Sequence, residues 1–179
     1  MSRLVQFLLL MTGWSSVLAA AGGEAPSPPE QALARLGITL PTPDKPVANY
    51  VKVVRTGNLL FLAGHGPCGE LDASVKGKVG RDLTVEQGYE AARRTAICLM
   101  ATLKGELGDL GKVRRIVKVL GMVNAVDGFT DQPKVINGAS DLLVQVFGDA
   151  GKHARSAVGV ASLPMNIAVE IEMVVEVAP

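Results

Sequence analysis

A stretch rich in valine and isoleucine, residues 113–126, restricts the possible folds of this chain more than any other segment. Its apolar residues occupy both alternating sets of positions, with Val117 and Val119 in one set and Ile116 and Leu120 in the other. A strand that is apolar on both faces belongs inside a sheet, with further layers packed against it. We therefore expect residues 113–126 to form a buried central strand.

Two amphipathic helices are predicted on either side of this strand. The first begins at Thr84, whose spacing to Gln87 fits a capping box, and apolar residues recur at helical spacing as far as Leu107. The second begins at Asp131, with Pro133 in its first turn.

Shorter strands are predicted toward both ends of the domain. Residues 50–55 and 59–63 flank a tight turn, residues 76–79 suit a short further strand, and residues 156–162 and 167–177 form two strands joined by a turn. The resulting order, β-β-(β)-α-β-α-β-β, predicts an α+β domain with both helices on one face of the sheet. The uncovered face is still apolar, so we expect it to meet another copy of the chain in a homo-oligomer with sites between subunits.

The N-terminus has the layout of a secretory signal peptide. Arg3 is followed by a mostly apolar run over residues 4–18 and then by three alanines, which predicts cleavage after Ala21 and export to the periplasm or the medium. An uncleaved anchor or an organelle-targeting peptide is the alternative. Residues 22–46 are a proline-rich lead-in, with a helical turn possible near its middle, and residues 47–179 form the domain.

Charge argues against nucleic acid as a partner. The full chain has 18 basic and 17 acidic residues, and loss of Arg3 with the signal peptide leaves 17 of each. Nucleic-acid binders carry excess or clustered Lys and Arg. No membrane association is expected after cleavage of the signal peptide.

The histidines and cysteines do not form a metal-binding pattern. His65 and His153 are isolated, and Cys68 and Cys98 are too few for a disulfide framework. An oxidising compartment would permit a bond between the two cysteines. The interpretation favoured from sequence is a buried helix thiol at Cys98 and a loop thiol at Cys68, with no metal and no cofactor.

Arg155 and Glu170 are the leading candidates for chemistry. The last strand alternates apolar residues with Glu170 and Glu172, and small residues such as Ala157 share the side of Arg155 on the preceding strand. If the two strands form a hairpin, Arg155 and the Glu170 region pass each other. An arginine in such a recess suits capture of a carboxylate, and a nearby glutamate can position or deprotonate water. The alternative is a surface salt bridge across the hairpin, and spacing alone favours this alternative, because such pairs are common.

Several motifs support the interpretation of Arg155 and Glu170 as functional residues. They are ARSAVGV over residues 154–160, Leu163-Pro164, AVEIE over residues 168–172, Asn49-Tyr50-Val51, Gly57-Asn58, Ala63-Gly64, and the helix over residues 135–147. Together these motifs resemble the signature of the RidA family, also called YjgF or L-PSP, and the resemblance covers residues 47–178.

The resemblance implies a chorismate-mutase-like fold and a homotrimer with pockets between subunits. It implies cofactor-independent hydrolysis of small enamine/imine carboxylates, such as 2-aminoacrylate and 2-iminobutanoate, to 2-keto acids and ammonia. Arg155 matches the arginine that holds the substrate carboxylate, and Glu170 matches the glutamate that orients the attacking water. The matching substrate-binding positions are Tyr50, Gly64, Asn137 and Ala157.

Three positions depart from the family pattern. Many deaminating members have Cys at the position of Ala157, and Ser-Gly-Gln is common where this chain has Ala63-Gly64-His65. These departures reduce pocket polarity and keep other functions open. The alternatives are a trimer that binds a small carboxylate metabolite without turnover, a ribonuclease, and a stress-induced holdase that would not depend on Arg155.

Overall fold

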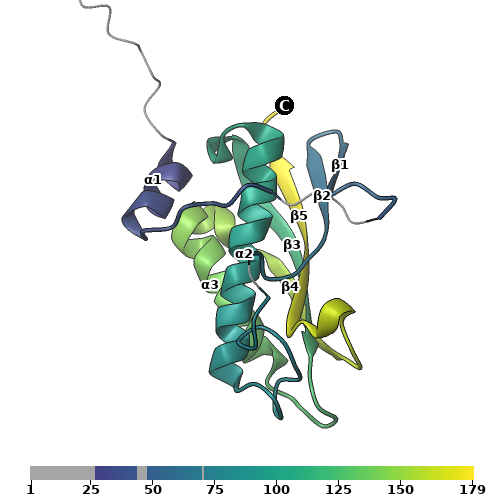
Figure 1. Ribbon diagram of the computed structural model, residues 1–179. Helices are drawn as coiled ribbons and strands as arrows, with labels where there is room; N and C mark the ends of the chain where they lie inside the picture. Colours follow the sequence, from purple (N-terminus) through teal and green to yellow (C-terminus); the bar gives the residue numbers. More distant parts are fainter. Residues whose placement is uncertain (1–26, 44–47, 70) are drawn as a thin grey trace, which may run out of the picture.

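A five-stranded sheet and a layer of helices form the domain (Figure 1). The computed structural model describes residues 27–43, 48–69 and 71–179, so the expected signal peptide and its cleavage after Ala21 lie outside the described residues. The helices and strands are α1 (Pro28–Arg35), β1 (Val53–Thr56), β2 (Leu59–His65), α2 (Val85–Leu107), β3 (Val113–Asn124), α3 (Gln132–Phe147), β4 (Ala154–Val160) and β5 (Val169–Val177). Short 3-10 helices are η1 (Leu110–Lys112), η2 (Gly148–Gly151) and η3 (Pro164–Asn166). The predicted α+β class is confirmed.

Helices α2 and α3 lie side by side over one face of the sheet, and α1 packs against α3 (Figure 1). The predicted capping box opens α2: the Gln87 amide donates to Thr84 Oγ1 at 3.2 Å, and the Thr84 amide donates to Gln87 Oε1 at 2.8 Å. Helix α3 begins with Pro133 in its first turn, as expected, although the Asp131 side chain makes no capping bond. The lead-in helix α1 covers the predicted helical turn.

Strand β3 is internal, as its two apolar faces predicted. It pairs with β5 on one side, antiparallel, and with β4 on the other, parallel. Ile116, Val119 and Val123 are fully buried against the helices. In place of the short strand expected at residues 76–79, Lys76 forms an isolated bridge with Ile167, and Val79 forms isolated bridges with Leu83 and Ala125.

The expected hairpin between the last two strands is wrong, because β3 lies between β4 and β5 in the sheet order β1-β2-β5-β3-β4. Helix α3 is a crossover between β3 and β4, and such a crossover makes these two strands parallel. β4 is therefore an edge strand on the far side of β3. The turn with η3 then carries the chain past the end of β3 to reach β5.

The face of the sheet away from the helices carries exposed apolar side chains. Val54, Phe61 and Val158 are 54%, 44% and 42% exposed, respectively. An open apolar face of this kind supports the expected contact with another copy of the chain. Within the described residues, no helix is long and apolar enough to cross a bilayer.

Candidate functional site

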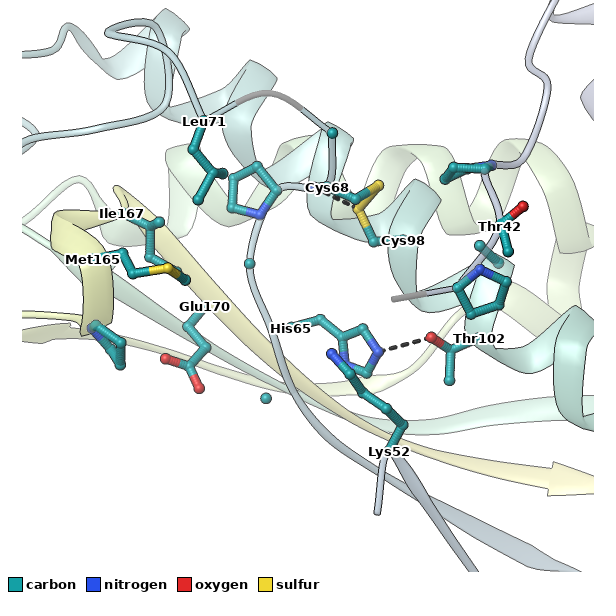
Figure 2. Close-up of a pocket in the computed structure, with 18 of the residues that line it drawn as sticks. Thr42, Lys52, His65, Cys68, Leu71, Cys98, Thr102, Met165, Ile167 and Glu170 are labelled. Atoms are coloured by element: carbon teal, nitrogen blue, oxygen red, sulfur yellow. Dashed lines mark hydrogen bonds between the residues drawn. A yellow bond between two sulfur atoms is a disulfide. The ribbon is translucent and has the colours of Figure 1, made fainter. Parts of the chain in front are cut away.

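The six predicted site residues fall into two separate groups. Arg155, Asn137 and Ala157 lie where β4 meets α3. Gly64, Tyr50 and Glu170 line a cavity at the end of β2 and the start of β5. Figure 2 shows Glu170 among the side chains around this cavity. We call these the arginine group and the glutamate group.

Arg155 is held by neutral acceptors on α3. Its Nη1 donates to Asn137 Oδ1 at 2.9 Å and to Ser140 Oγ at 3.0 Å. Among the described residues no acid forms an ion pair with it. The guanidinium is thus oriented while its charge stays unneutralised, the condition that suits bidentate binding of a carboxylate. Ala157, two residues along the same strand, is half-buried against the core and adds no polar group.

Two members of the arginine group, Ser140 and His153, were not predicted from the sequence. Ser140 Oγ lies 3.1 Å from His153 Nε2, and His153 Nδ1 lies 2.7 Å from the Gly151 carbonyl. Since Nδ1 must donate to the carbonyl, Nε2 accepts from the Ser140 hydroxyl, whose oxygen accepts from Arg155. Burial, with a contribution from Arg155, lowers the pKa of His153 and favours this neutral tautomer. Ser140 lies one helical turn after Asn137 on α3. This spacing was the signal in the sequence that could have placed Ser140 beside Arg155.

Glu170 projects from the sheet face that the helices leave open. It alternates with the buried Val169 and Ile171, as the pattern of the last strand predicted. Burial raises the pKa of the Glu170 carboxyl, and the neighbouring Glu172 raises it further. Among the described residues, Glu170 has no hydrogen-bond or ion-pair partner. A carboxylate in this state is a candidate general base.

Gly64 packs directly against the Glu170 carboxylate. A Cβ built at Gly64 would overlap this carboxylate, so the close approach requires glycine. The pairing of β2 with β5 shifts register between Leu62 and His65, at the point where Gly64 lies. The side-chain side of Gly64 faces Glu170, and because glycine has no side chain, its backbone approaches the carboxylate directly.

The cavity beside Glu170 has a volume of about 750 Å³, within the range of small-molecule sites. Figure 2 shows Glu170 with Met165 and Ile167 at one end, and Thr42 and Thr102 at the other. Tyr50 also lines it and is 43% exposed. The cavity therefore extends from Glu170 as far as α2 and the segment before β1.

His65 is buried at the floor of this cavity. Its Nδ1 lies 2.6 Å from the Ala63 carbonyl and its Nε2 lies 2.9 Å from Thr102 Oγ1. The Nδ1 N–H donates to the Ala63 carbonyl, and Nε2 shares a hydrogen bond with the Thr102 hydroxyl. This histidine joins the end of β2 to α2.

The two cysteines form a disulfide, so the interpretation as two free thiols is wrong. Cys68 lies in the loop after β2 and Cys98 is buried in α2, as expected, but their sulfur atoms are bonded and their Cα atoms are 5.6 Å apart. The bridge lines the same cavity as Glu170 (Figure 2). A sequence separation of 30 residues gave no sign of this proximity.

Arg155 and Glu170 lie on opposite faces of the sheet within one chain. Arg155 bonds to α3 on the helical side, whereas Glu170 faces away from the helices. Arg155 is paired with Val119, which lies opposite Met173, three residues beyond Glu170 on β5. One chain therefore does not assemble the two groups into one pocket.

Comparisons with known proteins cover most of the chain. Residues 30–177 match the model of the family described as "YjgF/chorismate_mutase-like, putative endoribonuclease". Protein TCP17 of Trypanosoma cruzi is 45% identical over 145 residues, which span 80% of this chain and 91% of that protein.

Two solved structures share both sequence and fold. Atu1372 of Agrobacterium tumefaciens, described as having unknown function, is 45% identical, with a TM-score of 0.78 over 84% of this chain and 92% of that one. A protein of Shewanella oneidensis described as a "putative endoribonuclease" is 31% identical, with a TM-score of 0.80 over 83% of this chain and 99% of that one. The expected chorismate-mutase-like fold is thereby confirmed, and the chain belongs to the YjgF/chorismate-mutase-like family, which is the RidA family that its motifs resemble.

Proposed function

We propose that the protein hydrolyses small enamine/imine carboxylates, of the 2-aminoacrylate and 2-iminobutanoate type, to 2-keto acids and ammonia without a cofactor. The observation that carries the proposal is the state of Arg155, which Asn137 and Ser140 orient while no described acid neutralises it. A second observation supports it: Glu170 is partly buried and unpaired, and its pKa is raised. These are the two groups that such a hydrolysis needs, one to bind a carboxylate and one to move a proton.

The proposal places the working site between two copies of the chain, in a homotrimer. One copy supplies Arg155 and its partner supplies Glu170, because a single chain holds the two groups on opposite faces. The exposed apolar residues Val54, Phe61 and Val158 offer a surface for this assembly.

The reaction follows from the chemistry of the two groups. Arg155 binds the carboxylate of the imino acid and fixes the position of the imine carbon. Water attacks that carbon while Glu170 accepts one of its protons and passes it to the nitrogen. The carbinolamine collapses when its hydroxyl proton reaches the nitrogen, so that the C–N bond breaks and ammonia and the 2-keto acid leave. The raised pKa of Glu170 favours both accepting and returning the proton near neutral pH.

Ammonia release tests this proposal. 2-Iminobutanoate and 2-iminopropanoate are generated in situ, and their hydrolysis is compared for the wild type, Arg155→Ala and the control Arg115→Ala, which removes an exposed arginine of β3. We expect Arg155→Ala to lower kcat/KM by about 100-fold, because a charged, bidentate contact is lost. The Arg115→Ala variant keeps wild-type rates. Equal acceleration by all three proteins would contradict the proposal.

Binding without turnover is the second candidate. Ala63 and Ala157 stand where deaminating relatives commonly have Ser and Cys, and both reduce the polarity of the groups described above. Calorimetric titration with 2-oxobutanoate separates the two functions. Saturable binding that requires Arg155, without ammonia release from any imine, would favour the binding protein.

Endoribonuclease activity is the third candidate, because the family description and the Shewanella oneidensis protein carry that name. Tyr50 is the one Phe, Tyr or Trp among the described residues that line the Glu170 cavity, which leaves little surface for base stacking. Cleavage of single-stranded RNA by the wild type but not by Arg155→Ala would support it.

Export of the protein is also part of the proposal, based on the apolar run and the alanines before Gly22. N-terminal sequencing of the protein recovered from its host tests it. A mature chain that begins at Gly22 is expected, and a chain that retains Met1 would contradict cleavage.

A further inference from the structure

A stripe of three α2 side chains holds the loop that follows β2. The stripe consists of Arg94, Cys98 and Thr102, which are spaced four residues apart and therefore lie on one face of the helix. The segment that we call the loop, residues 64–69, consists of the last two residues of β2 and the four residues after it. It begins at Gly64 against Glu170 and continues along the wall of the cavity.

Each member of the stripe contacts the loop. Thr102 Oγ1 bonds to His65 Nε2 at 2.9 Å. Cys98 forms the disulfide with Cys68, and its sulfur also accepts the Cys68 amide at 2.7 Å. Arg94 Nε donates to the Cys68 carbonyl at 2.7 Å. The disulfide is the covalent one of these contacts and the one that a thiol reductant can break.

The pairing of β2 with β5 is irregular at this part of the chain. Regular pairing between β2 and β5 is interrupted between Leu62 and His65, so Gly64 has no register partner on β5, although His65 next to it pairs with Ile171. The contacts of His65 and Cys68 with α2 therefore add to the sheet pairing in holding the Gly64 backbone close to the Glu170 carboxylate. Gly64, a proposed substrate-binding residue, lies only four residues before Cys68, so a change at Cys68 can shift its position.

The sulfur atoms are within reach of small reductants. Both cysteines line the cavity of about 750 Å³, and Cys68 is partly exposed. A dithiol that enters this cavity can transfer two electrons and two protons to the bridge, leaving thiols at Cys68 and Cys98 while the dithiol becomes a cyclic disulfide.

We propose that the Cys68–Cys98 disulfide is a positioning pair for the glutamate group, and that its reduction weakens substrate binding by releasing the loop around Gly64. This inference rests on the proposed function for its kinetic effect, although the loop tether itself does not. Reduction removes no atom of Glu170 or Arg155, so we expect the substrate affinity to change more than the chemical step.

Kinetics and hydrogen exchange together test the inference. The oxidised wild type, the wild type in dithiothreitol and Cys68→Ser/Cys98→Ser are assayed with 2-iminobutanoate, and amide exchange is followed for residues 64–69, with α3 as the reference. In the reduced wild type and in Cys68→Ser/Cys98→Ser we expect KM to rise about tenfold, because substrate binding must then order one or two loop residues. We expect kcat to stay within about twofold of the oxidised wild type. Exchange in residues 64–69 should become faster while α3 stays protected.

The controls separate failure of this inference from failure of the proposed function. Dithiothreitol should have no further effect on Cys68→Ser/Cys98→Ser, and circular dichroism should show that this variant is folded; if it is not, the reduced wild type alone decides. Unchanged KM and unchanged exchange after reduction would overturn the inference. If the oxidised wild type hydrolyses no imine, the proposed function fails, and the exchange of residues 64–69 still decides whether the disulfide positions the loop.

Discussion

Strand β3 separates the strand that carries Arg155 from the strand that carries Glu170, and the two side chains point to opposite faces of the sheet. The family resemblance assigns both residues to one substrate. This assignment and the structure agree if each pocket takes its arginine from one subunit and its glutamate from another.

Removing the residues that orient Arg155 should weaken substrate binding. Asn137→Ala and Ser140→Ala each delete a hydrogen bond to the guanidinium. We expect KM for 2-iminobutanoate to rise about tenfold in each variant, because a hydrogen bond to a charged group contributes roughly 1.5–3 kcal/mol. Steady-state kinetics measure this effect, and thermal melting shows whether the fold is kept. Unchanged KM in both variants would show that Arg155 does not need this orientation.

Glu170→Gln should abolish proton transfer while keeping the shape of the side chain. The expected loss in kcat is about 10²–10⁴-fold, the usual contribution of a general base. The matched control is Glu176→Gln on the same strand, which should keep wild-type kcat. A Glu170→Gln variant with more than half of the wild-type kcat would exclude Glu170 as the base.

The pH dependence of the rate should report the ionisation of Glu170. The rate falls as pH falls through the raised pKa, since the base is then protonated. Glu172→Gln removes a negative charge that raises this pKa, so the acid limb should move to lower pH. The acid limb should move only part of the way toward the usual range of a glutamate, because burial raises the pKa of Glu170 more than Glu172 does. A limb that does not move would assign the acid limb to another group.

The same pKa shift has a consequence for stability. A carboxyl with a raised pKa in the folded state favours folding most when it is protonated, and this contribution is lost as pH rises through the folded-state pKa. Glu170→Gln should therefore raise the thermal melting temperature relative to wild type more at pH 7 than at pH 4. Melting curves of both proteins at the two pH values measure the difference. A larger gain at pH 4 would contradict the direction of the shift.

Gly64→Ala should disable the glutamate group without removing any functional atom. The added methyl group would overlap the Glu170 carboxylate and force it out of place. We expect kcat/KM to fall by at least about tenfold, since small displacements of a catalytic group cost much of its effect. Ala63→Ser, which enlarges the neighbouring residue without this overlap, serves as the comparison. Wild-type kcat/KM in Gly64→Ala would show that the close approach of Gly64 and Glu170 is not needed for function.

Local sequence signals predicted the elements but not all of their neighbours. The Thr84–Gln87 capping box and the apolar faces of residues 113–126 gave α2 and β3 correctly, because both signals act within a few residues of the chain. The position of β3 between β4 and β5 depends on the α3 crossover, and a short connection before β5 favoured a hairpin instead. The alternation that placed Glu170 on the open face was nevertheless read correctly.

Contacts between distant residues account for the rest of what sequence analysis missed. His153 was judged isolated because its partner Ser140 lies on another element, and the hydrogen-bond chain to Arg155 exists only once α3 packs on β4. The Cys68–Cys98 bridge likewise depends on how the loop after β2 folds back onto α2. Such contacts are set by tertiary packing, which residue spacing does not encode.

Subunit mixing tests the central claim most directly. Arg155→Ala and Glu170→Gln, each inactive alone, are unfolded together in equal amounts and refolded, and 2-iminobutanoate hydrolysis is measured. If each site joins Arg155 of one subunit to Glu170 of another, random assembly should restore about a quarter of wild-type activity, because half of the subunits keep each residue. If both residues act from the same chain, every site lacks one of them, so activity that stays at the level of the separate variants would contradict the account.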